Sequence, residues 1–74
     1  MDEKMHELIA VGASYARSCE TFLAYHIRQA SQMGANTDEI MESIGIAQKV
    51  IVASTQRLDN LIERLTGKTA VGMV

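Results

Sequence analysis

The chain has 74 residues, which is enough for one small domain, and a formal net charge of −2. Its seven lysine and arginine residues are spread along the sequence without a basic stripe, which argues against a nucleic-acid-binding protein. Hydrophobic residues make up 47% of the chain, more than a lone helical domain of this size easily buries, and this excess predicts self-association. A single cysteine excludes a framework of intramolecular disulfides.

No targeting or membrane-spanning segment is expected. The apolar run Leu8–Ala13 is too short for a signal peptide or a transmembrane helix. The sequence also lacks the cysteine and histidine spacing typical of zinc sites, and we expect neither a metal ion nor a cofactor. These features predict a soluble, cytoplasmic protein.

The first predicted helix runs from about Asp2 to Arg17. Apolar residues recur there at intervals of three and four, which is typical of one buried helical stripe: Met5, Leu8, Ile9, Gly12 and Ala16. Glu7 lies on a neighbouring face. Its side chain has two interpretations, either an exposed acid near the start of the helix or one half of a relay with a histidine.

A short break and restart is expected near residues 18–20. Ser18 is predicted to cap the second helix, which would place Cys19 at the first helical position. The helix is expected to run to about Met33, because Gly34 is a natural C-terminal stop.

The third predicted helix follows a tight connector, in which either Asn36 or Thr37 can cap the helix and Asn36 with Glu39 has the spacing of a capping box. Its apolar stripe alternates at four and three residues, an unbroken heptad pattern: Ile40, Ile44, Ala47, Ile51, Ser54, Leu58, Leu61 and Leu65. The first half is apolar on its other sides too, so we expect it to be buried nearly all round, whereas the second half is amphipathic. Gly67 is expected to end the helix.

Together these elements predict an all-α fold in which two short helices form a hairpin and a long third helix packs across them. Residues 1–67 are expected to form one domain, and residues 68–74 a short tail. The apolar residues of the tail, Val71, Met73 and Val74, would be exposed unless another subunit covers them. Subunits are expected to assemble through the long heptad helix as a homo-oligomer, without nucleic acid or membrane partners.

The residues that can carry chemistry gather in the second helix. At about 100° per residue, Cys19, Phe22 and His26 fall on one stripe of its surface. A thiol near a helix start can be activated, so Cys19 is a candidate nucleophile; the alternative is a small, half-buried apolar residue. His26 is either the base of a relay with Glu7 or a core-facing histidine bonded to a carboxylate or carbonyl, and His6 is expected at the surface.

Three segments in the middle of the chain form a recognisable pattern: Tyr25-His26-Ile27-Arg28-Gln29-Ala30, Met33-Gly34-Ala35 and Thr37-Asp38-Glu39-Ile40-Met41-Glu42-Ser43. The pattern is a histidine, a polar pair, an alanine, a glycine turn and then the Glu-Ile-x-Glu start of a helix. It resembles the alkylhydroperoxidase D / carboxymuconolactone decarboxylase family, and the resemblance covers roughly Glu7 to Ala53. It implies an AhpD-like helical fold and assembly as trimers or hexamers.

The peroxidase branch of that family has a glutamate, eleven residues, a cysteine, two residues, a second cysteine, three residues and a histidine. Glu7, Cys19 and His26 match the first, second and fourth places, and Phe22 stands at the third. The resemblance implies that Glu7, Cys19 and His26 are catalytic, with a carboxylate–imidazole relay that helps to deprotonate a thiol for attack on a hydroperoxide. Because the family's attacking sulfur belongs where Phe22 stands, the two-cysteine cycle is not available to this chain.

Three functions remain open from the sequence. The first is a thiol-dependent peroxidase or oxidoreductase, in which an external thiol or a cysteine of another subunit would reduce the oxidised Cys19. The second is a decarboxylase-like enzyme that acts on a small carboxylate or lactone through His26 and acidic groups. The third is a non-catalytic helical module that serves oligomerisation.

Overall fold

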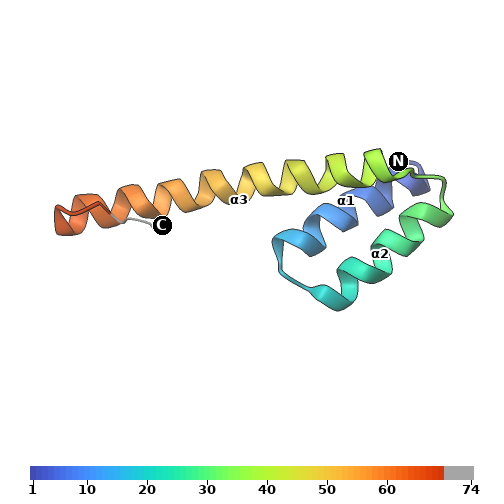
Figure 1. Ribbon diagram of the computed structural model, residues 1–74, viewed down its shortest axis with the longest axis horizontal. Helices are drawn as coiled ribbons and strands as arrows, with labels where there is room; N and C mark the ends of the chain where they lie inside the picture. The colour runs from blue at the N-terminus through green and yellow to red at the C-terminus, as the bar shows by residue number, and fades with distance from the viewer. Residues whose placement is uncertain (70–74) are drawn as a thin grey trace.

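The structure is a computed structural model that describes residues 1–69. These residues form three helices and the short links between them. In chain order they are α1 (Glu3–Ala16), α2 (Glu20–Gln32) and α3 (Thr37–Thr66). Figure 1 shows α1 and α2 as an antiparallel hairpin beside one end of α3, with α1 lying between α2 and α3. The described residues contain no strand, and the predicted all-α fold of two short helices and one long helix is confirmed.

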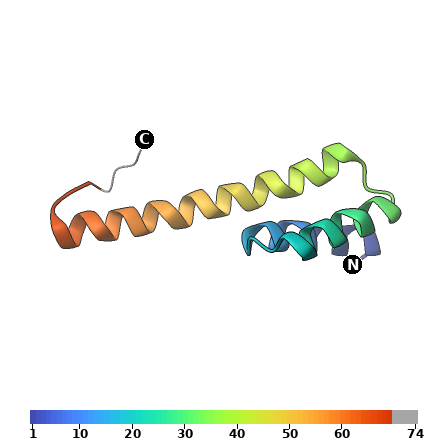
Figure 2. The ribbon, with the colours of Figure 1, turned by 60° about the horizontal axis from the view of Figure 1, so that its bottom comes forward.

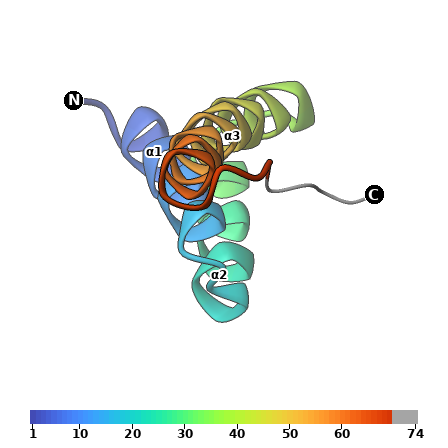
Figure 3. The same cartoon turned by 90° about the vertical axis from the view of Figure 1, so that its left-hand side faces the viewer.

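The long helix gives the molecule its shape. α3 has 30 residues, against 14 in α1 and 13 in α2, and its C-terminal half extends beyond the hairpin (Figure 2). The molecule therefore measures 50 × 22 × 18 Å. Seen along α3, the hairpin lies on one side of the long helix (Figure 3).

The start of α1 is fixed by Asp2. Its Oδ1 accepts a hydrogen bond from the backbone N–H of Met5 at 2.7 Å, which satisfies one of the free amides of the first turn. The buried face of α1 consists of Leu8, Val11 and Ser14. The helix predicted from the apolar spacing therefore agrees with the observed one to within a residue at each end.

The link between α1 and α2 differs from the prediction. Ser18 adopts a positive φ of 56°, and Cys19, not Ser18, is the N-cap of α2. Ser18 N–H donates to the Tyr15 carbonyl, and Cys19 N–H donates to the Ser14 carbonyl. These two bonds form the turn that closes a helix C-terminus, so Ser18 ends α1 instead of starting α2.

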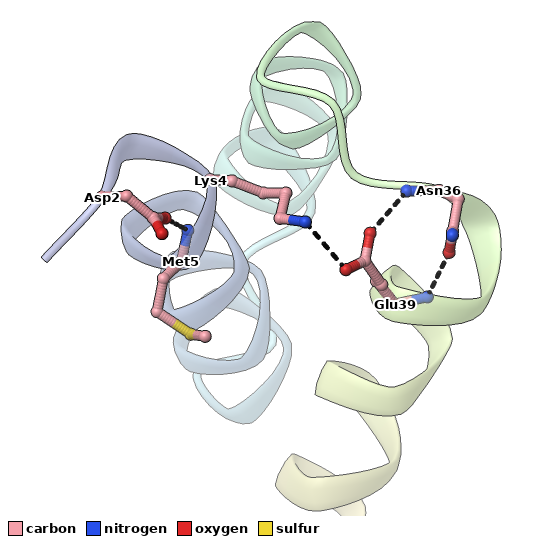
Figure 4. A network of polar contacts seen from close by, with 5 residues as sticks. All are labelled: Asp2, Lys4, Met5, Asn36 and Glu39. Carbon is pink, nitrogen blue, oxygen red and sulfur yellow. Dashed lines mark hydrogen bonds and ion pairs between the residues drawn. The ribbon is translucent and has the colours of Figure 1, made fainter.

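The link between α2 and α3 agrees with the prediction. Gly34 has a φ of 98° and closes α2 by the same kind of turn. Asn36 then caps α3: its side chain accepts from Glu39 N–H at 2.8 Å, and Glu39 accepts from Asn36 N–H at 3.0 Å. The Lys4 ammonium of α1 also donates to Glu39 Oε2 at 3.0 Å, and this ion pair links the starts of α1 and α3 (Figure 4).

The core is small and gathers where the hairpin meets the first turns of α3. Its members are Leu8, Val11, Ala30, Ala35 and Ile40, with Leu23, Ile27 and Ile44 packed against them. In the first half of α3, three large apolar side chains are 57–60% exposed: Met41, Ile46 and Val50. The prediction that this half is buried nearly all round is therefore wrong for the single chain, because only α1 packs closely along it and α2 contacts it sparsely.

A close helix approach joins α1 to α3. Ser43 Oγ donates to the Leu8 carbonyl at 2.5 Å. A Cβ added at Gly12 would lie 3.2 Å from Ser43 Oγ, so the absence of a side chain at Gly12 lets the two helices meet at this distance. Gly12 thus allows the close spacing of α1 and α3 at this point.

Gly67 ends α3 in a left-handed conformation with φ of 75°, as expected from the sequence. The tail residues Val71, Met73 and Val74 lie outside the described residues. Within residues 1–69, none of the helices is both long enough and apolar enough to span a membrane.

Candidate functional site

A hydrogen-bonded pair of side chains joins the two helices of the hairpin. Glu7 on α1 and His26 on α2 meet with 2.7 Å between Oε1 and Nδ1. Their side chains are 15% and 23% exposed, so both are mostly buried but keep some contact with solvent. When the carboxylate is ionised, Nδ1–H donates to it, and Nε2 is the ring nitrogen left to accept a proton.

The Glu7 carboxylate contacts a second imidazole as well. Its Oε2 lies 3.5 Å from Nδ1 of His6, whose side chain is 71% exposed at the surface, as expected from the sequence. The hydrogen bond from His26, together with the smaller contributions of both histidines, holds the pKa of Glu7 below its ordinary value. Of the two interpretations of Glu7, the structure favours the pair with a histidine over an exposed acid.

Two aromatic rings lie next to His26. The centroid of Phe22 is 6.3 Å from that of His26, and Tyr25 meets the imidazole edge-on at 5.0 Å. Phe22 is 61% exposed and Tyr25 is 47% exposed. Phe22 therefore does not fill a closed pocket in the single chain; it forms an open aromatic wall beside the imidazole.

Cys19 lies apart from the pair. Its thiol is free and half-buried, and its side chain makes no capping hydrogen bond. Two surface hollows meet at it: the Leu23 hollow, of about 380 Å³, and the Arg17 hollow, of about 490 Å³. Neither hollow includes Glu7 or His26 among its walls.

The spacing along α2 explains this separation. Cys19 precedes His26 by two helical turns, which is roughly 10 Å along the axis, whereas Phe22 precedes it by one turn. The residue on the stripe that adjoins the imidazole is thus Phe22, a side chain without acid–base or redox chemistry. Of the three residues expected to be catalytic, the structure brings Glu7 and His26 together and leaves Cys19 at the other end of the stripe.

The sequence model of the carboxymuconolactone decarboxylase family matches residues 1–58. The chain belongs to this family. Comparisons with curated proteins and with solved structures gave no match. The match spans Glu7, Cys19, Phe22 and His26, so the whole candidate site lies within the family's region.

This member of the carboxymuconolactone decarboxylase family is a helical unit in which Glu7 and His26 form a carboxylate–imidazole pair. Among residues 1–69, no group of three histidine, cysteine or acidic side chains is placed to hold a metal ion. The residues present can orient an imidazole, exchange a proton through it and offer a thiol at a separate place, the start of α2. They favour acid–base chemistry at His26 and thiol chemistry at Cys19 as two separate capabilities.

Two polar residues around Cys19 were not identified as functional candidates from the sequence. Ser14 is only 8% exposed, and it contributes to both hollows. Arg17 contributes to one of them. The sequence could have indicated Ser14, because it lies seven residues after Glu7 on the same face of α1. It could not have predicted the turn that brings Cys19 beside Ser14, because nothing in the sequence marks the positive φ of Ser18.

Proposed function

We propose that the protein is a general acid–base catalyst of the decarboxylase-like kind, which acts on a small carboxylate or lactone. The observation that carries this proposal is the 2.7 Å hydrogen bond between Glu7 and His26. A carboxylate bonded to Nδ1 fixes the ring orientation and makes Nε2 the basic position. In a decarboxylation, the C–C bond to the substrate carboxylate breaks and releases CO₂; an imidazole that has taken up a proton from solvent at Nε2 donates this proton to the carbanion that remains.

The aromatic wall supports an organic substrate. Phe22 and Tyr25 flank the imidazole with exposed ring surface, which suits contact with an apolar or planar molecule. Phe22 also occupies the place of the second cysteine of the two-cysteine motif, one turn from His26, so no sulfur lies there. The base therefore has no thiol beside it and is free to act on the substrate directly.

The experiment is a turnover assay over a panel of small lactones and carboxylates that includes carboxymuconolactone, with CO₂ release as the readout. His26→Gln is expected to lower kcat by about 100-fold or more, because positioned acid–base groups contribute roughly 10²–10⁴-fold. Glu7→Gln is expected to lower it less, because the imidazole survives but loses its orientation. Glu3→Gln, which removes a carboxylate of α1 outside the pair with His26, is the control and is expected to leave turnover unchanged; full turnover by His26→Gln would contradict the proposal.

A second candidate function is a one-cysteine peroxidase at Cys19, favoured by the free, half-buried thiol that two hollows reach. Its thiolate attacks the terminal oxygen of a hydroperoxide, which gives a sulfenic acid on Cys19 and an alcohol. One external thiol then condenses with the sulfenic acid to a mixed disulfide and releases water, and a second external thiol restores the Cys19 thiol and leaves as the external disulfide. Trapping of the sulfenic acid with dimedone after hydroperoxide treatment, followed by mass spectrometry, tests this step.

The two candidates are separable by variant. Cys19→Ser is expected to abolish hydroperoxide consumption and to leave lactone or carboxylate turnover unchanged. His26→Gln is expected to abolish that turnover. A protein without either activity would leave the non-catalytic oligomerisation module as the function.

Self-association is part of the proposal in each case. Beyond the hairpin, the heptad stripe of α3 carries large exposed apolar side chains: Leu58 at 60%, Leu61 at 39% and Leu65 at 76%. Apolar surface in an unbroken helical stripe is stabilised when a second helix covers it. A homo-oligomer formed through this stripe accounts for the apolar composition of the chain.

A further inference from the structure

Ser14 is a buried polar residue whose side chain has no assigned role in the fold. It is 8% exposed, yet among residues 1–69 its hydroxyl forms no hydrogen bond. No fully enclosed polar side-chain atom of the described residues lacks a partner, so the Ser14 hydroxyl remains reachable from solvent. The Leu23 hollow and the Arg17 hollow both include Ser14 in their walls, beside Cys19. A mostly buried hydroxyl that lines both hollows and bonds to no other described residue is available to a ligand with an acceptor atom.

The start of α2 offers further donors at the same place. Cys19 caps the helix without a side-chain bond, and Leu23 N–H is the first amide to bond back, to the Cys19 carbonyl. The amides of residues 20–22 therefore have no partner within the helix. Free amides at a helix start, together with the helix dipole, attract negative charge.

The two hollows differ in chemistry. The lining of the Arg17 hollow includes the basic Arg17 and the aromatic Phe22. The lining of the Leu23 hollow includes Leu23, Ile51 and Tyr15, and also the acidic Glu20. A negative group is thus favoured in the Arg17 hollow, which Glu20 does not line, and an apolar group in the Leu23 hollow.

We infer that Cys19 exchanges with low-molecular-weight disulfides that carry a carboxylate, which the Arg17 hollow binds through Arg17 and the Ser14 hydroxyl. The Cys19 thiolate attacks one sulfur of the disulfide, the S–S bond breaks, and the other half leaves as a thiolate. The product is a mixed disulfide on Cys19, and no electrons are gained or lost overall. This exchange depends neither on hydroperoxide chemistry nor on the Glu7–His26 pair, so its test stands apart from those of the proposed function.

The test compares reaction rates with two chromogenic disulfides, the anionic dithiobis(nitrobenzoate) and the neutral dithiodipyridine. The quantity compared is the second-order rate constant for the anionic disulfide divided by that for the neutral one. Differences in thiol exposure between variants affect both rate constants and therefore cancel in this ratio. Arg17→Gln is expected to lower this ratio by roughly two- to fivefold, the effect of one exposed ion pair. Arg28→Gln removes the same charge from α2 outside both hollows and is expected to leave the ratio unchanged.

Two further readouts sharpen the result. The ratio of the rate constants for the anionic and the neutral disulfide is expected to fall with added salt in the wild type but not in Arg17→Gln. Ser14→Ala is expected to lower the ratio while the helical circular dichroism stays that of the wild type. An unchanged ratio in Arg17→Gln, or an equal loss in Arg28→Gln, would overturn the inference.

Discussion

Glu7 lies between two imidazoles, one half-buried and one exposed, and its carboxylate is the centre of the candidate site. Its partner His26 is nineteen residues away in sequence and on another helix. Helical periodicity predicts which face of each helix carries these residues, but not how far one helix is shifted along the other. The sequence therefore indicated both residues, and only the packed hairpin gave their contact.

The first prediction at this scale concerns pH. The pKa of Glu7 is lowered from 4.5, chiefly by the hydrogen bond from His26. A carboxyl with a lowered folded-state pKa stabilises the fold above its unfolded pKa, and this stabilisation is lost as the pH falls through the folded-state value. The free energy of unfolding of the wild type should therefore exceed that of Glu7→Gln at about pH 6, and the difference should shrink below about pH 4.5.

Denaturant unfolding of both proteins over this pH range measures the difference. Glu3→Gln, which removes a carboxylate of α1 outside the pair with His26, serves as the control. A gap between wild type and Glu7→Gln that persists unchanged to the lowest pH would show that the pair does not stabilise the fold.

The second residue-scale prediction concerns Phe22. Phe22→Cys places a thiol one turn from His26, where the imidazole held by Glu7 can accept its proton. One equivalent of hydroperoxide is expected to oxidise this thiol and Cys19 to a disulfide, with release of an alcohol and water. Mass spectrometry detects the loss of two hydrogens.

Two controls accompany this gain of function. Phe22→Ser opens the same space without a sulfur and should consume no additional hydroperoxide. The double variant Phe22→Cys with His26→Gln should react much more slowly than Phe22→Cys alone. Equal rates for these two proteins would mean that His26 does not activate a thiol at this place.

At the scale of the elements, the residues that cap the helix ends determined how well the helix boundaries could be predicted. Asp2, Asn36 and Gly67 have strong preferences for the places that they occupy, and α1 and α3 accordingly begin and end close to the expected residues. Ser18 has no such preference, because serine favours a helix start, whereas here it ends one with a positive φ. The sequence could not distinguish these two uses of a serine between helices.

A pair of glycines tests the α1–α3 approach. Both lie inside helices, where alanine is favoured over glycine by roughly 0.5–1 kcal/mol. A Cβ at Gly45 meets no atom within 4 Å, so Gly45→Ala should raise the free energy of unfolding by about that amount. A Cβ at Gly12 meets Ser43 Oγ at 3.2 Å and the Ser43 carbonyl at 3.4 Å.

Ser43 cannot move away without breaking its bond to the Leu8 carbonyl. Gly12→Ala is therefore expected to destabilise the protein by about 1–2 kcal/mol, the usual cost of overpacking a close contact. Urea unfolding of both variants at equal protein concentration provides the comparison. If Gly12→Ala stabilised the protein as much as Gly45→Ala, the close approach would not limit the packing of α1 on α3.

At the scale of the whole molecule, the heptad stripe of α3 is longer than the hairpin that could cover it. Only Ile40 and Ala47 on this helix are buried, and residues 52–66 are almost all exposed. The sequence could predict that this stripe prefers a covered environment, but periodicity does not state whether the cover comes from the same chain. This is why the prediction of an enclosed first half of α3 was wrong for one chain alone.

The prediction that belongs here is a change in assembly. The wild type is expected to sediment as an oligomer at micromolar concentration, and Leu58→Gln combined with Leu65→Gln should shift it toward the monomer. Val52→Gln is the control, because Val52 is as exposed as Leu58, at 60%, but lies on another side of the helix. A wild-type protein that stays monomeric at micromolar concentration would contradict assembly through the stripe.

The unsupported length of α3 also has a consequence for amide hydrogen exchange. A helix of about 15 residues without packing partners is only marginally stable in water, so in a lone chain the amides of residues 52–66 exchange by local fraying. Once another helix covers them, the same amides must wait for the subunits to separate. Their protection factors should therefore rise with protein concentration, whereas those of the hairpin core depend on global unfolding. The amide protection factors of the second half of α3 thus measure the fraction of chains that are assembled into an oligomer.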